Sequence, residues 1–588
     1  MPKRLAGVVL TAFLSATFVA PTATAAASDP TYDPTNQANP IDVQVLAITD
    51  LHGYLAPTTG ADATLPTADG QTLTVGGGAF LSAHLDRAAS GQANSIRVSN
   101  GDNFSGWPWQ VMFSRDEATI EYLNHIGLDV SSVGNHEVDV SLDFLTPHMT
   151  DGECLGEPGV DSCFPTSTGE PFTGARFPFL AANLRTAPTG QRPLASSWVD
   201  TVRGADGSEA RVGFIGVMPP DTERVFSSYQ VGGLVTTDLA AAVDSAAAEL
   251  QEDGAEAIVL LAHEGATNRA TYEACDTAGG PIMRLAEQVT PAVDVVIGGH
   301  WHSAATCTVT DPAGQQRPVL TPGHHGRTFG DIRFQIDPST GDVLRSSLNA
   351  RNVPVTRDIA PDPEVVSMVQ HWEAWAARRW AEPIGTVTED ITRARDESGE
   401  SAMGNLVADA YRDIGTWSSP GGADLALTDP SHVRNPLTYA AGTNPADSNG
   451  TVLFGESWSA TGRAGSIVTV SVSGHDLREA FEQQWQGSTF VPLSVSDNVE
   501  VSIDPWLLAG ERVVQVTVDG KPIKPNRNYR VAMPSRLALG LDGFPALKSE
   551  VNPTRSDMDY WAFQQWMERQ DTLSAPATDR VHTTTPVG

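Results

Sequence analysis

The chain has 588 residues, too many for one compact core, so we expect two or more domains. Hydrophobic residues make up 40% of it and aromatic residues 7%, a composition that argues against intrinsic disorder and coiled coil. The formal net charge of −34 disfavours binding to nucleic-acid polymers and to anionic lipid. A small anionic ligand would therefore need local positive charge from metal ions or arginines.

The N-terminus has the three parts of a secretory signal peptide. Lys3-Arg4 forms a basic start, an apolar stretch runs from Leu5 to Ala20, and Ala23-Thr24-Ala25 is a small-residue cleavage pattern. We predict a signal peptide at 1–25, an exposed leader at 26–40 and an extracytoplasmic location. An uncleaved anchor helix is the disfavoured alternative. No second apolar run reaches the ~20 residues that span a membrane, so we expect no membrane span after cleavage.

Four cysteines follow the predicted signal peptide, and an even number in an exported chain indicates disulfides. Three pairings are possible, of which we favour Cys154–Cys163 with Cys275–Cys307. A zinc ribbon is disfavoured because the sequence contains no Cys-x-x-Cys.

Apolar strands alternate with helical segments from Ile41 to about Val355, the pattern of an α/β layered domain. We therefore predict a first domain at 41–355. A helical run within 356–383 is predicted to connect it to a second α/β domain at 384–588.

Five predicted strands in the first domain run directly into residues of metal-binding types. These residues are Asp50 and His52, then Asp102, Asn135 and His136, His263, and finally His300 and His302. Sites in α/β proteins gather at the carboxyl ends of strands. A single histidine after a strand is more often structural, but five such junctions favour one shared site. Asp, Asn and His suit divalent Zn, Mn, Fe, Co or Mg.

The motif order resembles that of the calcineurin-like metallophosphoesterases, and within them the 5′-nucleotidase family. The motifs are Asp50-x-His52, Gly101-Asp102, Gly134-Asn135-His136-Glu137, His263 and Gly299-His300-x-His302. Met403–Ala410 in the second domain also resembles that family, so the likeness covers nearly the whole mature chain. It implies an N-terminal four-layer sandwich of two mixed sheets flanked by helices, followed by a C-terminal α/β domain.

The resemblance implies two divalent metal ions and assigns their ligands. One ion would be held by Asp50, His52 and His302, the other by Asn135, His263 and His300, and Asp102 would bridge them. It implies attack of a metal-bound hydroxide on phosphorus without a covalent intermediate.

His136 is implied to stabilise the transition state and protonate the leaving oxygen, with Asp139 orienting it. The run His136-Glu137-Val138-Asp139 favours the 5′-nucleotidase branch over the cyclic phosphodiesterase/3′-nucleotidase branch, which typically has Asn-Tyr there.

In that family the C-terminal domain binds the nucleoside. The resemblance assigns substrate contacts to Asn405, Arg434 and Asp542, and it places Arg463 and Arg536 where the family has two base-stacking aromatics. Stacking is worth about 1–3 kcal/mol per base, so their loss would weaken base selectivity unless the arginine planes stack instead. Nearby aromatics that could substitute are interpreted as core: Phe454, Trp458, Trp506 and Phe544.

We therefore predict an exported 5′-nucleotidase whose partner is a small anionic phosphate ester, and in which nucleotide anhydrides or UDP-sugars are further substrates. The alternatives are a 2′,3′-cyclic phosphodiesterase/3′-nucleotidase, a phosphatase for a non-nucleotide ester, and a non-catalytic exported binding protein. The complete set of ligand types disfavours the last. The oligomeric state is left open.

Overall fold

The structure, a computed structural model, describes residues 39–105, 108–186, 189–220, 234–268, 271–275, 279–461, 465–549 and 551–585. The predicted signal peptide and Arg463 lie outside the described residues. Within these ranges no helix is both long enough and apolar enough to cross a bilayer.

The first of two mixed sheets in the N-terminal half has the strand order β16-β15-β1-β4-β5-β6, with β17 also paired to β15. Strand β1 (Ile41–Ile48) runs antiparallel to β15 (Thr328–Asp337) and parallel to β4 (Ser95–Ser99). The other strands are β5 (Val130–Ser132), β6 (Phe179–Leu180), β16 (Asp342–Val343) and β17 (Asn349–Pro354).

The second sheet has the order β13-β14-β12-β11-β9-β8. Its four central strands are parallel: β9 (Glu209–Val217), β11 (Ala257–Ala262), β12 (Val295–Ile297) and β14 (Gln316–Pro322). The antiparallel edge strands are β8 (Ser197–Arg203) and β13 (Ala304–Thr310).

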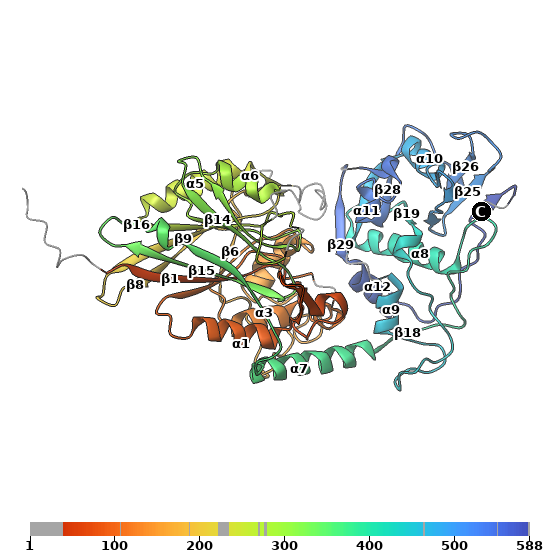
Figure 1. Cartoon of the computed structure of the whole chain (residues 1–588). Helices are drawn as coiled ribbons and strands as arrows, with labels where there is room; N and C mark the ends of the chain where they lie inside the picture. Colours follow the sequence, from red (N-terminus) through yellow and green to blue (C-terminus); the bar gives the residue numbers. More distant parts are fainter. Residues whose placement is uncertain are drawn as a thin grey trace, which may run out of the picture. The chain divides into compact units, whose positions relative to one another are not determined.

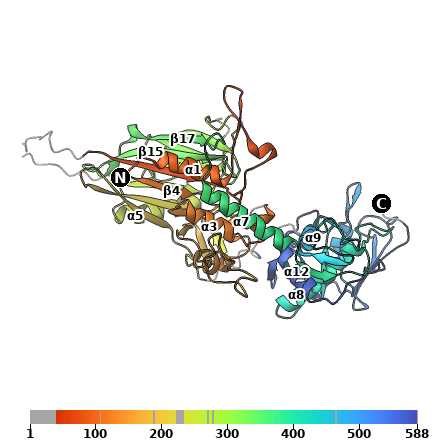
Figure 2. The same cartoon turned by 90° about the horizontal axis from the view of Figure 1, so that it is seen from below.

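Side-chain alternation along β1 explains the layering. Val43, Val45 and Ala47 lie in the core between the two sheets, whereas Leu46 and Ile48 lie in a second core on the opposite face. That second core is closed by α1 (Gly78–Ala89), α3 (Glu117–His125) and α7 (Pro363–Trp380) (Figures 1 and 2).

Helices α5 (Leu239–Glu252) and α6 (Pro281–Gln288) cover the outer face of the second sheet (Figure 1). The predicted four-layer sandwich is therefore confirmed. Helix α7 lies within the segment predicted to connect the domains. Its N-cap is Asp362, whose carboxylate accepts the N–H groups of Glu364 and Val365.

The C-terminal half is built on a sheet of order β24-β19-β28-β21-β29. The strands are β24 (Ser494–Val495), β19 (Leu425–Thr428), β28 (Asn528–Pro534), β21 (Ser466–Ser473) and β29 (Thr554–Met558). Helices α8 (Ala402–Ser418), α9 (Phe454–Thr461) and α12 (Asp559–Glu568) share the core on one face.

The other face packs against α10 (Gly474–Glu482), α11 (Ser535–Ala538) and a second sheet of order β27-β26-β25-β30. Those strands are β27 (Lys521–Pro522), β26 (Val513–Val518), β25 (Val499–Ile503) and β30 (Val581–Thr583). The chain is thus α/β in both halves, as predicted.

Both predicted disulfides are present. The Cα atoms of Cys154 and Cys163 are 5.4 Å apart, and those of Cys275 and Cys307 are 5.0 Å apart. The favoured pairing among the three possible ones is confirmed.

Candidate metal centre

The predicted metal-binding residues meet where strands of both sheets end. Asp50 and His52 follow β1, Asp102 follows β4, Asn135 follows β5, His263 follows β11, and His300 and His302 follow β12. Five of these side chains are buried, and those of His300 and His302 are half-buried. The strands of two sheets thus bring residues more than 200 positions apart to one site.

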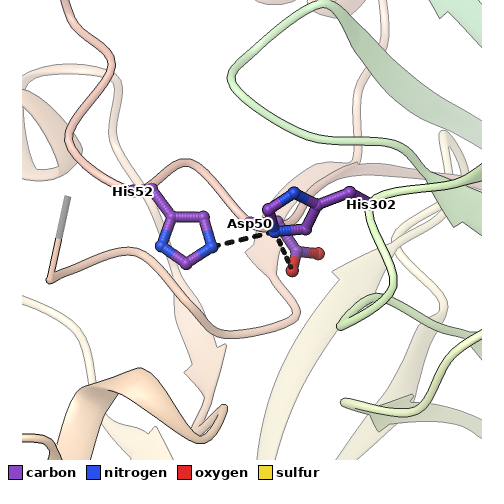
Figure 3. Close-up of side chains that lie close together, drawn as sticks. All are labelled: Asp50, His52 and His302. Atoms are coloured by element: carbon purple, nitrogen blue, oxygen red, sulfur yellow. Dashed lines mark hydrogen bonds and ion pairs between the residues drawn. The ribbon is translucent and has the colours of Figure 1, made fainter. Parts of the chain in front are cut away.

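One group consists of Asp50, His52 and His302 (Figure 3). The Nε2 atoms of His52 and His302 are 3.1 Å apart, and Nε2 of His302 lies 3.5 Å from Oδ1 of Asp50. These potential ligand atoms lie within 4.8 Å of one another, a spacing that can surround one cation.

A second group consists of Asp102, His263 and His300, again within 4.8 Å. Nε2 of His263 lies 2.9 Å from Oδ2 of Asp102, and the same oxygen is 3.8 Å from Nε2 of His52. Asp102 therefore contacts both groups. Oδ1 of Asn135 is buried and has no hydrogen-bond partner within the described part of the chain.

Second hydrogen bonds orient two of the imidazoles. Nδ1–H of His52 donates to the carbonyl oxygen of Phe104 at 3.1 Å, and Nδ1–H of His263 donates to that of Asn100 at 2.6 Å. Each Nε2 is then the nitrogen that faces the other candidate ligands. Metal-binding histidines in proteins are held in this way.

The backbone at the site is strained. Five of the seven candidate ligands have positive φ: Asp50 (48°), His52 (49°), Asp102 (52°), His300 (67°) and His302 (56°). Such angles are uncommon outside glycine and cluster at functional sites. Gly134 is required by close approach, since a Cβ there would lie 2.3 Å from Oδ1 of Asp102.

The electrostatics fit a cation. Burial raises the pKa of the Asp50 carboxyl to about 7, the response of a carboxylate that lacks sufficient opposite charge. Burial also lowers the pKa of His302 to about 4, which favours the neutral imidazole that a metal requires. The buried, orphaned oxygen of Asn135 and the convergent nitrogen and carboxylate donors suit borderline divalent ions.

His136 lies beside this site, with its ring centroid 5.0 Å from that of His52. Its Nδ1–H donates to Oδ2 of Asp139 at 2.6 Å, and its backbone N–H donates to Oδ1 of Asp102 at 2.8 Å. Burial lowers the pKa of His136, but the carboxylates of Asp139 and Asp102 outweigh this effect and raise it to about 10.

Glu137 has a role that sequence reasoning missed. Its buried carboxylate accepts the backbone N–H groups of Asp102 (2.9 Å), Asn103 (2.7 Å) and Gly134 (2.7 Å), together with the Asn103 side-chain amide (3.0 Å). It therefore joins the loops after β4 and β5. The sequence feature that could have indicated this role is the position of Glu137 directly after the candidate ligands in the Gly134-Asn135-His136-Glu137 motif.

The predicted substrate contacts lie in different surroundings. Asp542 accepts two hydrogen bonds from the Arg536 guanidinium, at 2.7 and 3.0 Å. Asp542 also lies near the paired Asp429 and His432, which are 2.8 Å apart. Arg434 is exposed on the segment between β19 and β20 (Thr451–Leu453).

Asn405 is fully buried in α8, where its amide donates to Glu400 and to the carbonyl oxygen of Ala577. Its predicted contact with substrate gains no support from this position. Phe454 and Phe544 lie in the core and Trp458 packs against it, but Trp506 is 81% exposed, so its interpretation as core was wrong.

Comparison with known proteins agrees with the site. Residues 43–304 match the calcineurin-like phosphoesterase family and residues 383–549 the 5′-nucleotidase C-terminal domain. The chain is 26% identical to cell wall protein Lmo0130 of Listeria monocytogenes, with 95% of this chain and 70% of that protein covered. It is 25% identical to endonuclease YhcR of Bacillus subtilis, with 85% of this chain and 37% of that protein covered.

Among solved structures, NAD nucleotidase of Haemophilus influenzae has the same fold. The TM-score is 0.56 and the identity 17%, and the match covers 93% of this chain and all of that one (100%). These matches and the site define a metal-dependent phosphoester hydrolase. The chain belongs to the calcineurin-like phosphoesterases, in the 5′-nucleotidase family that adds the characteristic C-terminal domain.

Proposed function

We propose that the protein is an exported two-metal phosphohydrolase that releases phosphate from nucleoside 5′-monophosphates. Nucleotide anhydrides and sugar nucleotides are further candidate substrates. The observation that carries the proposal is the convergence of six predicted ligands into two adjoining groups, with Asp102 of the second group in contact with His52 of the first and the His136–Asp139 pair beside them.

Asp50, His52 and His302 would hold one ion, and Asn135, His263 and His300 the other, with Asp102 between them. Bound divalent ions would neutralise charge on the phosphate and activate the attacking water. The five ligands with positive φ are held in place by the strands behind them, so little rearrangement would be needed on binding.

His136 would act on the phosphoryl group and the leaving oxygen. The bond from its Nδ1–H to Asp139 leaves Nε2 as the nitrogen for substrate and stabilises the imidazolium. A protonated His136 would stabilise charge that develops in the transition state and donate a proton from Nε2 to the leaving oxygen.

Arg434, Arg463, Arg536 and Asp542 would contact the remainder of the substrate. The bidentate bond with Asp542 fixes the plane of the Arg536 guanidinium. A fixed guanidinium plane can stack on a base, which supports a nucleotide substrate despite the missing aromatics.

Export is supported by the signal-peptide pattern at 1–25 and by similarity to a cell wall protein. We also propose the domain boundaries given by the sequence, with a catalytic domain at 41–355, a connection at 356–383 and a substrate-binding domain at 384–588.

Phosphate release from a substrate panel tests this function. The panel contains AMP, UMP, ATP, UDP-glucose, 3′-AMP, 2′,3′-cyclic AMP and an aryl phosphate, each with Mn²⁺, Zn²⁺, Co²⁺ or Mg²⁺. Preference for AMP or UMP that His136→Ala abolishes would support it. Turnover of only the cyclic, 3′- or aryl esters would reject the substrate while retaining the chemistry. Absence of both metal and turnover would favour a binding protein.

A further inference from the structure

A cluster outside the predicted ligand set lies directly against His302. It consists of Asp62 on the 3₁₀ helix η1 (Gly60–Ala63) and of His324 and His325 in the turn after β14. The His324 and His302 rings are stacked, with centroids 4.8 Å apart and planes 19° apart. The His325 ring meets His302 edge-on at 5.4 Å.

Two hydrogen bonds tie this turn to main-chain oxygens of the first ligand group. Nδ1–H of His324 donates to the carbonyl oxygen of His302 at 2.7 Å, and the backbone N–H of His325 donates to that of Asp50 at 2.9 Å. Both acceptor residues have positive φ, a conformation that persists only where the surroundings fix it. The turn therefore helps to set the directions of two ligands of the same ion.

Asp62 in turn holds His325 and lies against His324. Its Oδ2 accepts Nδ1–H of His325 at 3.1 Å, and its Oδ1 lies 3.4 Å from Nε2 of His324. The Tyr54 ring also stacks on the His325 ring, with centroids 3.7 Å apart. Rotation of His325 would therefore break both a hydrogen bond and a ring contact.

The charge of Asp62 is already matched within the cluster. Arg327 donates from Nη1 to Nε2 of His324 at 3.1 Å, and the same nitrogen lies 4.0 Å from Oδ1 of Asp62. A guanidinium in this place makes the cluster a hydrogen-bonded support rather than a further cation site.

We propose that Asp62, His324 and His325 are positioning residues that orient Asp50 and His302. They would thereby set the affinity for the metal ion held by Asp50, His52 and His302. The inference rests on the proposed function, because it takes Asp50 and His302 as ligands. Removal of a residue that orients metal ligands typically weakens binding about 10–100-fold. Asp62 is the residue to change, since its carboxylate accepts the hydrogen bond from His325 and lies against His324.

The test compares full-length wild type with Asp62→Ala, Asp62→Asn and the control Asp69→Asn. Asp69 is exposed in the hairpin that follows η1, between β2 (Thr64–Pro66) and β3 (Thr72–Thr74), and its carboxylate accepts a hydrogen bond from the Gln71 side chain. Metal content is measured after dialysis against limiting Mn²⁺, and the absorption spectrum of the Co²⁺ form is recorded.

For Asp62→Ala we expect Mn²⁺ to bind at least about tenfold more weakly at the position formed by Asp50, His52 and His302. The metal content should therefore fall from about two ions per chain to about one, and the absorption spectrum of the Co²⁺ form should change. Excess Mn²⁺ should restore phosphate release. Asp62→Asn keeps an oxygen that can accept from His325, so it should lie between wild type and Asp62→Ala. Asp69→Asn should match wild type.

Equal metal affinity and spectra in wild type and Asp62→Ala, with only a lower unfolding temperature, would overturn the inference alone. Three ions in wild type that fall to two in Asp62→Ala would also overturn it, because the cluster would then bind a metal itself. Wild type that binds no metal would overturn the proposed function as well.

Discussion

Nδ1 of His136 lies 2.6 Å from Oδ2 of Asp139, three residues further along the chain. The 3₁₀ turn η2 (His136–Val138) brings the two side chains together, and Asp139 is 4% exposed. A buried carboxylate on one imidazole nitrogen fixes which nitrogen faces the adjoining metal centre.

We expect His136→Ala to lower kcat about 10²–10⁴-fold, because general acid catalysis is lost. Asp139→Asn should lower it less, since the amide still accepts the Nδ1–H bond but no longer stabilises the imidazolium. Phosphate release measures both effects. The control Asp143→Asn changes an exposed carboxylate on the next segment and should be neutral. Full activity in His136→Ala would remove this residue from the mechanism.

Glu137→Gln should weaken both the fold and metal binding. The amide oxygen can replace only part of the four hydrogen bonds that the carboxylate accepts, and each unsatisfied buried donor costs about 1–3 kcal/mol. Denaturant unfolding and metal analysis measure the two losses. The exposed Glu153→Gln is the matched control. Unchanged stability and metal content in Glu137→Gln would contradict the role given to Glu137.

Strand junctions were the most predictable part of the molecule. Buried apolar runs such as β1 and β11 have a clear pattern, and residues directly after them are placed by the sheet with little freedom. The support from Asp62 and His324 could not be predicted in the same way. Asp62 lies on a short 3₁₀ helix directly before β2, and its distance of 262 residues from His324 is closed only by the tertiary fold.

The predicted substrate contacts in the C-terminal half rest on less local evidence than the strand junctions. Asn405 lies in a helix whose register buries it, and its amide is used by Glu400 and Ala577. A motif shared with relatives does not distinguish a buried polar residue from one that contacts substrate. Trp506, expected in the core, lies instead on the exposed connection between β25 and β26.

Glu117 should make stability fall at alkaline pH. Its buried carboxyl group accepts hydrogen bonds from the backbone N–H groups of Cys163 and Phe164. Burial raises the pKa of this group from 4.5 to about 8. The folded state then binds the proton more tightly than the unfolded state, so this contribution is complete below pH 4.5 and is lost as the pH rises through about 8. Between pH 4.5 and about 8, the free energy of unfolding should decline less in Glu117→Gln than in wild type. An equal decline with pH in the two proteins would contradict the role given to Glu117.

The two disulfides should differ in their contribution to stability. Cys275–Cys307 closes a loop of 32 residues and Cys154–Cys163 one of 9. Loop-closure entropy then predicts that replacing the first pair by serines costs about 1 kcal/mol more than replacing the second. Denaturant unfolding of the two double variants measures this, and the reverse order would show that local contacts outweigh the loop-length effect.

Arg536→Phe should increase selectivity for nucleotides over an aryl phosphate. An aromatic ring would add base stacking worth about 1–3 kcal/mol, or roughly 5–150-fold in kcat/KM for AMP. Arg536→Ala is the matched control, because it also breaks the bond to Asp542 but adds no ring. Equal AMP selectivity in the two variants would place Arg536 away from the base.

Anomalous scattering from a Mn²⁺-soaked crystal tests the two-metal centre most directly. We predict two peaks about 3.5–4 Å apart, with Asp102 between them. One should be flanked by Asp50, His52 and His302, and the other by Asn135, His263 and His300. A single peak, or ions held by other residues, would contradict the proposed centre.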